Sequence, residues 1–117
     1  MTTTLPMTEV DDRPALLIVD DDQTFCTVLA NAMTKRGFNV TCAHSVDQAL
    51  ELAEACTPEY AIIDLRLPGP SGLSLVEKLK ALDPGTRIVM LTGYGSIATA
   101  VEAIKLGATH YLAKPVD

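Results

Sequence analysis

Several acidic residues of this sequence stand directly after short apolar runs. Asp20-Asp21-Asp22 follows Leu16–Val19, and Asp64 follows Ala61–Ile63. At least three carboxylates would share one crevice if the two runs are neighbouring strands. Like charges at this spacing repel one another, and a bound divalent cation relieves the repulsion. A set of oxygen ligands with open positions for water suits Mg²⁺, so we expect a magnesium site here.

Two further runs end in residues that suit phosphate chemistry. Thr92-Gly93 offers a hydroxyl donor and an accessible backbone N–H, and Lys114 adds a fixed positive charge. Mg²⁺ and Lys114 together could hold the oxygens of a transferring phosphoryl group. Asp64, at the centre, could then attack phosphorus and form an acyl phosphate.

Each of these residues alone has a simpler explanation. An acid after a strand is usually a helix cap, which is a sufficient role for Asp22. A threonine at a strand end usually caps a turn, a lone lysine is usually solvated, and glycines give loops their freedom. The joint pattern favours chemistry, because four strand ends carry complementary parts of one reaction.

The elements that must position these residues alternate between two periods. Strand-like runs occupy Ala15–Asp20, Asn39–Ala43, Tyr60–Asp64, Arg87–Thr92 and His110–Ala113. Strands that alternate with helices through short connections form parallel βαβ units with right-handed crossovers. We therefore expect an α/β fold: a flavodoxin-like, doubly wound, five-stranded parallel sheet of order 2-1-3-4-5. Its switch point lies between strands 1 and 3, where ligands bind in such sheets.

The helices between these strands show apolar residues at helical spacing. The predicted apolar faces comprise Phe25, Val28, Leu29, Ala32 and Met33; Val46, Ala49, Leu50 and Ala53; Leu73, Val76 and Leu79; and Ile97, Val101 and Ile104. Gly37 and Gly107 stand where a left-handed residue ends a helix. Ser45 and Gln48 have the spacing of a capping box.

Composition excludes several classes of function. The chain of 117 residues has a formal charge of -6 and lacks a basic run, so we expect no nucleic-acid binding by this domain alone. It lacks an apolar run of membrane-spanning length, and we expect a cytoplasmic protein without membrane contact. Cys26, Cys42 and Cys56 are best explained as packing residues in a reducing compartment. His44 and His110 are isolated, which disfavours a metal or phosphorelay role.

Four segments together resemble the receiver domains of two-component response regulators. They are LLIVDDD (16–22), AIIDLRLPGPSGL (61–73), VMLTGYGS (89–96) and GATHYLAKP (107–115). The resemblance covers about residues 14–117 and leaves 1–13 as a flexible N-terminal tail. It implies a phospho-acceptor switch and not a turnover enzyme, with a sensor histidine kinase as phosphoryl donor.

The resemblance also implies a role for each matching residue. Asp64 would accept the phosphoryl group, and Asp21, Asp64 and the Arg66 carbonyl would bind Mg²⁺ directly. Asp20 would act on the metal through water. Thr92 and Tyr111 would move as the switch, with Lys114 paired to the phosphoryl oxygens and a cis Lys114-Pro115 bond. Arg66 and Tyr94 would tune the lifetime of the phosphoryl group.

Two longer segments, DLRLPGPSGLSLVEKL and LTGYGSIATAVEAIKLGATHYLAKP, look like redox-responsive regulators of photosynthesis and respiration. Those regulators carry a Fis-type helix-turn-helix output, so DNA would be bound by a domain outside this chain. In that family a final helix follows the strand-5 Lys-Pro, whereas this chain stops at Asp117, so either it is an excerpt of a longer protein or the helix is missing. An apolar patch would then be bare, and we expect self-association or homodimer formation.

Two other functions remain open from the sequence. Asp20-Asp21-Asp22 contains the DxD pattern of haloacid-dehalogenase-like phosphatases, in which Asp20 would be the nucleophile. A flavodoxin-like FMN carrier is the other, although three aspartates after the first strand would repel the FMN phosphate.

Overall fold

The structure is a computed structural model that describes residues 12–65, 67, 72–92 and 97–113. The expectations for Arg66, Gly93, Tyr94, Lys114 and the Lys114-Pro115 bond lie outside the described residues. For Thr92 the structure describes the backbone and not the side chain.

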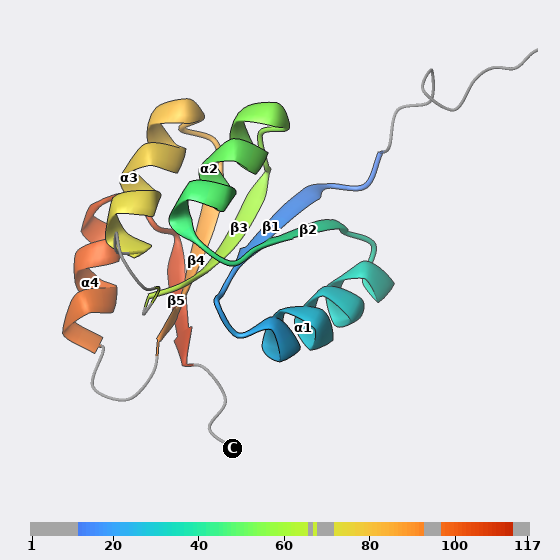
Figure 1. Ribbon diagram of the computed structural model, residues 1–117. Helices are drawn as coiled ribbons and strands as arrows, with labels where there is room; N and C mark the ends of the chain where they lie inside the picture. The colour runs from blue at the N-terminus through green and yellow to red at the C-terminus, as the bar shows by residue number, and fades with distance from the viewer. Residues whose placement is uncertain (1–11, 66, 68–71, 93–96, 114–117) are drawn as a thin grey trace, which may run out of the picture.

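Five strands and four helices alternate along the described chain (Figure 1). The strands are β1 (Ala15–Val19), β2 (Asn39–Ala43), β3 (Tyr60–Asp64), β4 (Arg87–Thr92) and β5 (His110–Ala113). The helices are α1 (Gln23–Lys35), α2 (Val46–Ala55), α3 (Gly72–Leu82) and α4 (Ile97–Lys105). The predicted strands are confirmed, except that β1 ends one residue before Asp20.

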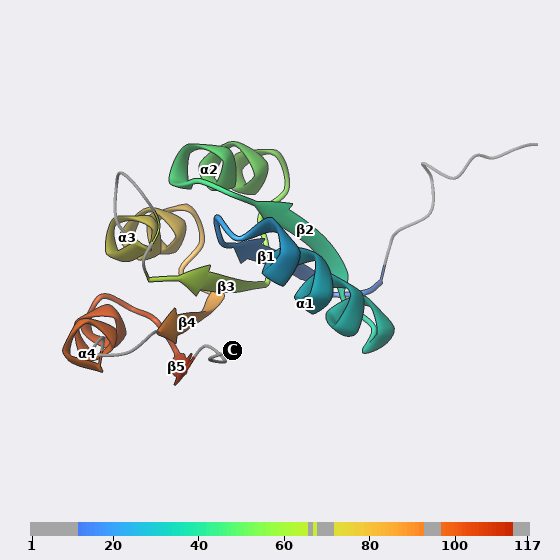
Figure 2. The same ribbon diagram turned by 60° about the horizontal axis from the view of Figure 1, so that its bottom comes forward.

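The strands form one parallel sheet in the order β2-β1-β3-β4-β5, which confirms the predicted topology. Figure 2 shows α2, α3 and α4 on one face of this sheet and α1 on the other. β1 and β3 lie at the centre, where apolar side chains are covered on both faces. Leu16–Val19 is accordingly buried throughout.

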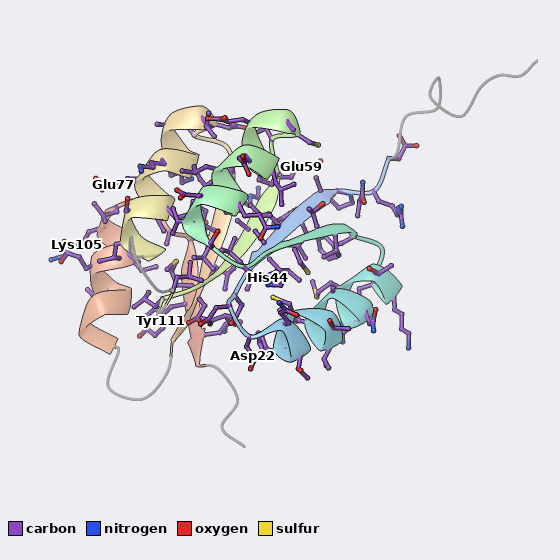
Figure 3. The ribbon with its side chains drawn as sticks, in the orientation of Figure 1. Asp22, His44, Glu59, Glu77, Lys105 and Tyr111 are labelled. Atoms are coloured by element: carbon purple, nitrogen blue, oxygen red, sulfur yellow. The ribbon has the colours of Figure 1, made fainter. Side chains whose placement is uncertain are left out.

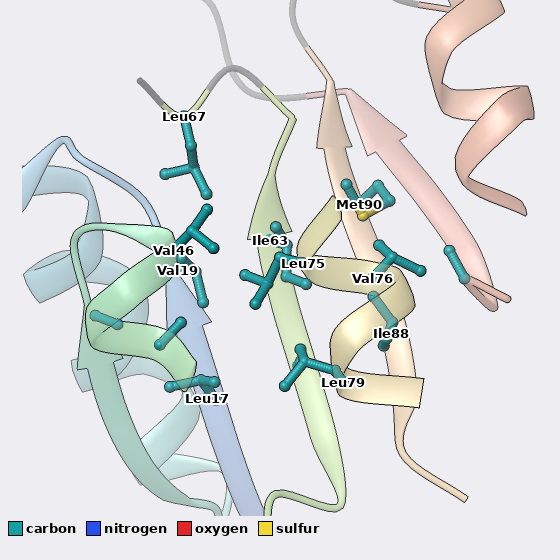
Figure 4. Close-up of a cluster of buried hydrophobic side chains, with 14 of the residues drawn as sticks. Leu17, Val19, Val46, Ile63, Leu67, Leu75, Val76, Leu79, Ile88 and Met90 are labelled. Carbon is teal, nitrogen blue, oxygen red and sulfur yellow. The ribbon is translucent and has the colours of Figure 1, made fainter. Parts of the chain in front are cut away.

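Two apolar clusters hold the layers together. The larger lies between the sheet and α2, α3 and α4, and includes Val19, Ile63, Leu75 and Met90 (Figure 4). The smaller lies under α1, where its buried members are Leu16, Ile18 and Cys26. Because successive side chains of β1 point to opposite faces, this single strand contributes to both clusters.

The predicted apolar faces of α1 and α4 differ from the buried ones. Val28 of α1 is 64% exposed, and Val101 and Ile104 of α4 are 43% and 37% exposed. Among the side chains that the structure describes, Cys26 is the buried residue of α1 and Ala103 is that of α4. The helical period was therefore right, but the buried stripe is narrower and rotated toward small side chains.

The predicted helix ends are largely confirmed. Gly37 and Gly107 adopt φ values of 99° and 121°, a left-handed conformation that favours glycine. The Ser45 hydroxyl accepts a hydrogen bond from the Gln48 N–H at 3.1 Å and so caps α2. The Gln48 side chain instead accepts from the His44 N–H at 2.7 Å, one residue before the position a capping box uses.

Among the helices that the structure describes, none has the length and apolar character needed to cross a membrane.

Candidate functional site

The register of β1 and β3 places two of the predicted site residues side by side. Val19 is paired with Ile63, so Asp20 and Asp64, the next residue of each strand run, are level with one another. Both strands point the same way, and their carboxyl ends therefore open onto the same edge of the sheet. The edge also lies at the switch point, since β1 leads toward β2 on one side and β3 toward β4 on the other.

Three carboxylates converge at this edge. One oxygen each from Asp20, Asp21 and Asp64 lie within 4.8 Å of one another. Asp20 and Asp64 are buried, whereas Asp21 is exposed. The possible metal ligands are therefore three carboxylates, of which Asp20 and Asp64 lie on the buried side and Asp21 on the side that is open to solvent. This chemistry fits Mg²⁺, which prefers oxygen ligands and retains several waters.

Asp22 stands apart from the three. Its side chain accepts from the Phe25 N–H at 3.0 Å and caps α1. Its own N–H donates to Oδ1 of Asp20 at 2.9 Å. The role as a helix cap is therefore confirmed, and the backbone of Asp22 also holds the Asp20 carboxylate in one orientation.

Directly after Asp64, Leu65 lies in a turn beside β4. The Leu65 N–H donates to the Leu91 carbonyl at 3.0 Å, which extends the β3–β4 ladder by one residue. Gly72, the first residue of α3, is buried against this turn. A β-carbon there would lie 2.9 Å from the Asp64 carbonyl oxygen and 3.3 Å from Cα of Leu65. Glycine therefore lets α3 begin directly against the backbone of the predicted acceptor.

The carbonyl of Asp20 is also held. It accepts from Nδ1 of His44 at 2.9 Å and from Sγ of Cys26 at 3.3 Å. No role was predicted for His44 from the sequence, because an isolated histidine carries no spacing signal. The one available signal was its position after β2, beside the strand that carries the aspartates.

Burial of Cys26 raises the pKa of its thiol to about 12, and nearby Cys42, Asp20 and Asp22 add to this effect. Burial likewise raises the pKa of Cys42, against a lowering by its contact with Cys26. Both thiols therefore stay protonated at neutral pH. This agrees with the packing role predicted for these two cysteines, and a protonated Cys26 can donate to the Asp20 carbonyl. Cys56 is exposed, so the packing role predicted for it is wrong.

Two further predicted residues lie in β4 and β5: Thr92 is the last residue of β4, and Tyr111 lies within β5. Leu91 pairs with Asp64, so the backbone of Thr92 lies one residue beyond the level of Asp64. Thr92 pairs in turn with Ala113. Tyr111 of β5 is 38% exposed and lies on the α4 side in Figure 3. The register thus directs the ends of β4 and β5 toward the edge that carries the acidic cluster.

Known proteins resemble this chain in both sequence and fold. The model of the family described as "Response regulator receiver domain" matches residues 16–117. The photosynthetic apparatus regulatory protein RegA of Rhodovulum sulfidophilum is 52% identical over 93% of the chain and 60% of its own length. The acid tolerance regulatory protein ActR of Rhizobium meliloti is 52% identical over 88% of the chain and 53% of its own length.

A solved relative has a similar fold. It is a response regulator from Burkholderia pseudomallei, solved with a phosphorylated aspartic acid, calcium ion and citrate. It superposes with a TM-score of 0.82 at 48% identity and covers 89% of this chain and 61% of that chain. The chain thus spans little more than half the length of RegA and ActR.

Proposed function

Because this chain belongs to the response regulator receiver domain family of two-component systems, we propose that Asp64 accepts a phosphoryl group with the help of Mg²⁺. The observation that carries the proposal is the convergence of Asp20, Asp21 and Asp64 within 4.8 Å. The response regulator from Burkholderia pseudomallei, which was solved with a phosphorylated aspartic acid and a calcium ion, supports the same chemistry here.

Asp21, Asp64 and the backbone carbonyl of Arg66 would hold Mg²⁺ directly, and Asp20 would hold it through water. When bound, Mg²⁺ neutralises charge on the carboxylates and on the incoming phosphoryl oxygens. An oxygen of Asp64 attacks phosphorus in a phosphohistidine of a sensor histidine kinase. The P–N bond breaks, and its electron pair leaves with the imidazole nitrogen. Lys114 pairs with a phosphoryl oxygen and offsets its charge.

The new phosphoryl group then selects one of two arrangements of the α4–β5 face. Thr92 and Tyr111 move as the switch; Tyr111 is 38% exposed, so an inward movement would bury more of its surface. Arg66 and Tyr94, two residues beyond Asp64 and Thr92, set the lifetime of the phosphoryl group. The domain acts as a switch, with at most self-phosphorylation and autodephosphorylation activity.

The names of the relatives support a regulatory role for the parent protein. RegA is named for regulation of the photosynthetic apparatus and ActR for acid tolerance. In our proposal the receiver controls a transcriptional output domain in the cytoplasm, where DNA is bound by the output domain. The exposed apolar residues of α4 and β5, among them Ile104 and Leu112, are consistent with self-association.

The test is direct. Incubation with acetyl phosphate and Mg²⁺ should give a hydroxylamine-labile adduct, and the Asp64→Asn variant should give none. An adduct that persists in this variant would move the acceptor to another residue. Borohydride trapping identifies that residue: labelling of Asp20 would support the phosphatase alternative, which the family match does not favour.

A further inference from the structure

The peptide group between Asp20 and Asp21 is held from outside its own strand. Its carbonyl oxygen accepts from Nδ1 of His44 at 2.9 Å, and Sγ of Cys26 shares the same oxygen at 3.3 Å. In the preceding peptide group, between Val19 and Asp20, the Asp20 N–H donates to the Ala43 carbonyl at 3.0 Å. The β1–β2 ladder thus continues past its last paired residues through the side chain of His44.

This peptide group decides where Asp21 points. A peptide unit is planar, so a fixed Asp20 carbonyl also fixes the direction of the Asp21 N–H and Cα. Asp21 is exposed, yet its carboxylate lies within 4.8 Å of those of the buried Asp20 and Asp64. An exposed side chain gains little direction from packing, so the orientation of its backbone matters most.

His44 is itself fixed by the start of α2. The backbone N–H of His44 donates to the Gln48 side chain at 2.7 Å. The backbone N–H of Gln48 donates in turn to the Ser45 hydroxyl at 3.1 Å. The half-buried side chain follows the end of β2, and its ring lies beside Cys26 of α1, 3.9 Å from Sγ to Nδ1 (Figure 3). A continuous set of hydrogen bonds therefore joins the cap of α2 to the peptide that carries Asp21.

We propose that His44 is a positioning residue for the acidic cluster. Its Nδ1–H holds the Asp20 carbonyl and thereby orients Asp21 for Mg²⁺; the Mg²⁺ part of this inference rests on the proposed function. The role needs a donor at Nδ1, which the Nδ1–H tautomer and the imidazolium both supply. It therefore concerns hydrogen bonding and not the titration of His44.

A matched pair of variants isolates this donor. His44→Asn places an amide N–H₂ where Nδ1 was, and His44→Leu has nearly the same branched shape without a donor. In the metal-free protein, we expect the NMR amide resonance of Asp21 to move in the leucine variant. It should return toward the wild-type position in the asparagine variant. The Asp21 amide is a suitable probe because the Asp21 N–H and the Asp20 carbonyl belong to the same peptide group.

Magnesium titration of the same proteins gives the second measurement. We expect the leucine variant to bind Mg²⁺ about tenfold more weakly, as is typical when a residue that orients a ligand is lost. The asparagine variant should bind within about twofold of wild type, and far-UV circular dichroism should show all three folded. Equal weakening in both variants, or wild-type affinity in both, would overturn the inference.

The outcomes separate this inference from the function on which it rests. Absence of Mg²⁺ binding by the wild-type chain would contradict the proposed function, whatever the variants do. The Asp21 resonance still tests the positioning in that case, since it is measured without metal. An Asp21 resonance that stays in place in the leucine variant would overturn the role of His44 even if Mg²⁺ binds.

Discussion

The β-carbon that Gly72 lacks would lie 2.9 Å from the carbonyl oxygen of Asp64. The start of α3 and the turn that carries the predicted acceptor are thus in direct contact, with no room for a methyl group. Backbone cannot move aside as a flexible side chain does, so any added atom must displace one of the two segments.

We therefore expect Gly72→Ala to lower the free energy of unfolding by about 1–3 kcal/mol, as overpacking does in well-packed cores. Phosphorylation by acetyl phosphate should also slow, because the displaced segment carries Asp64. Urea unfolding and the rate of adduct formation measure the two effects. Glu77→Ala, on the exposed side of the same helix, is the control and should change neither. A Gly72→Ala protein as stable as wild type would contradict the predicted crowding.

Asp22 should matter for stability more than for metal binding. Its side chain caps α1 through the Phe25 N–H, and it is not one of the three clustered carboxylates. Asp22→Ala should lower the free energy of unfolding by about 1 kcal/mol, and Asp22→Ser should recover most of the loss. Both variants retain the backbone N–H that holds Asp20, so Mg²⁺ affinity should change little in either. A large loss of Mg²⁺ affinity in the serine variant would instead make Asp22 part of the metal site.

Lys80 connects the end of α3 to the start of β4. Its ammonium donates to the carbonyls of Pro84 and Thr86 at 2.9 and 2.7 Å, and its stem lies beneath Gly107. Lys80→Met keeps much of the stem and removes the donors, so we expect a loss of about 1–3 kcal/mol in urea unfolding. Lys78→Met, an exposed position on the same helix, is the matched control and should be neutral. Equal effects of the two substitutions would show that the carbonyl contacts contribute nothing specific.

We expect the free energy of unfolding to fall at alkaline pH because the thiol of Cys26 is buried. Its pKa is raised from 9.0 to about 12 by burial, so the folded state keeps this proton while the unfolded chain releases it. The stabilisation is complete below pH 9 and is lost as the pH rises toward 12, because the unfolded state binds fewer protons in that window. Cys26→Ala should show a shallower decline in the free energy of unfolding between these values. Parallel declines in the two proteins would place the alkaline transition on other groups.

The sheet and its acidic cluster could be predicted because both follow from local patterns. The β-rich runs, their alternation with helices and the rule for parallel crossovers leave few arrangements. Any of these puts Asp20 and Asp64 at the same edge. His44 could not be assigned in this way, since its contact with the Asp20 carbonyl depends on how β2, α1 and α2 pack together. The role of Gly72 could not be predicted either, because it depends on the short distance between this residue and the backbone of Asp64.

The helix faces show a second limit of the sequence. Apolar residues at helical spacing predicted α1 and α4, yet Val28, Val101 and Ile104 are substantially exposed. Hydrophobicity alone does not say which part of an apolar stripe meets the sheet. In both helices a small side chain, Cys26 or Ala103, faces the core, since it allows the helix to approach the strands closely.

The unequal size of the two apolar clusters has a consequence for native-state fluctuations. Among the residues that the structure describes, the cluster under α1 has three buried members, whereas the cluster under α2, α3 and α4 has many more. Detachment of α1 should therefore be among the least costly partial openings of the molecule. Such an opening would remove the hydrogen bond from Cys26 to the Asp20 carbonyl. It would also disturb residues 20–22, which connect β1 to α1. A cation bound between Asp20, Asp21 and Asp64 should then slow amide hydrogen exchange in α1, although none of these three aspartates belongs to the helix.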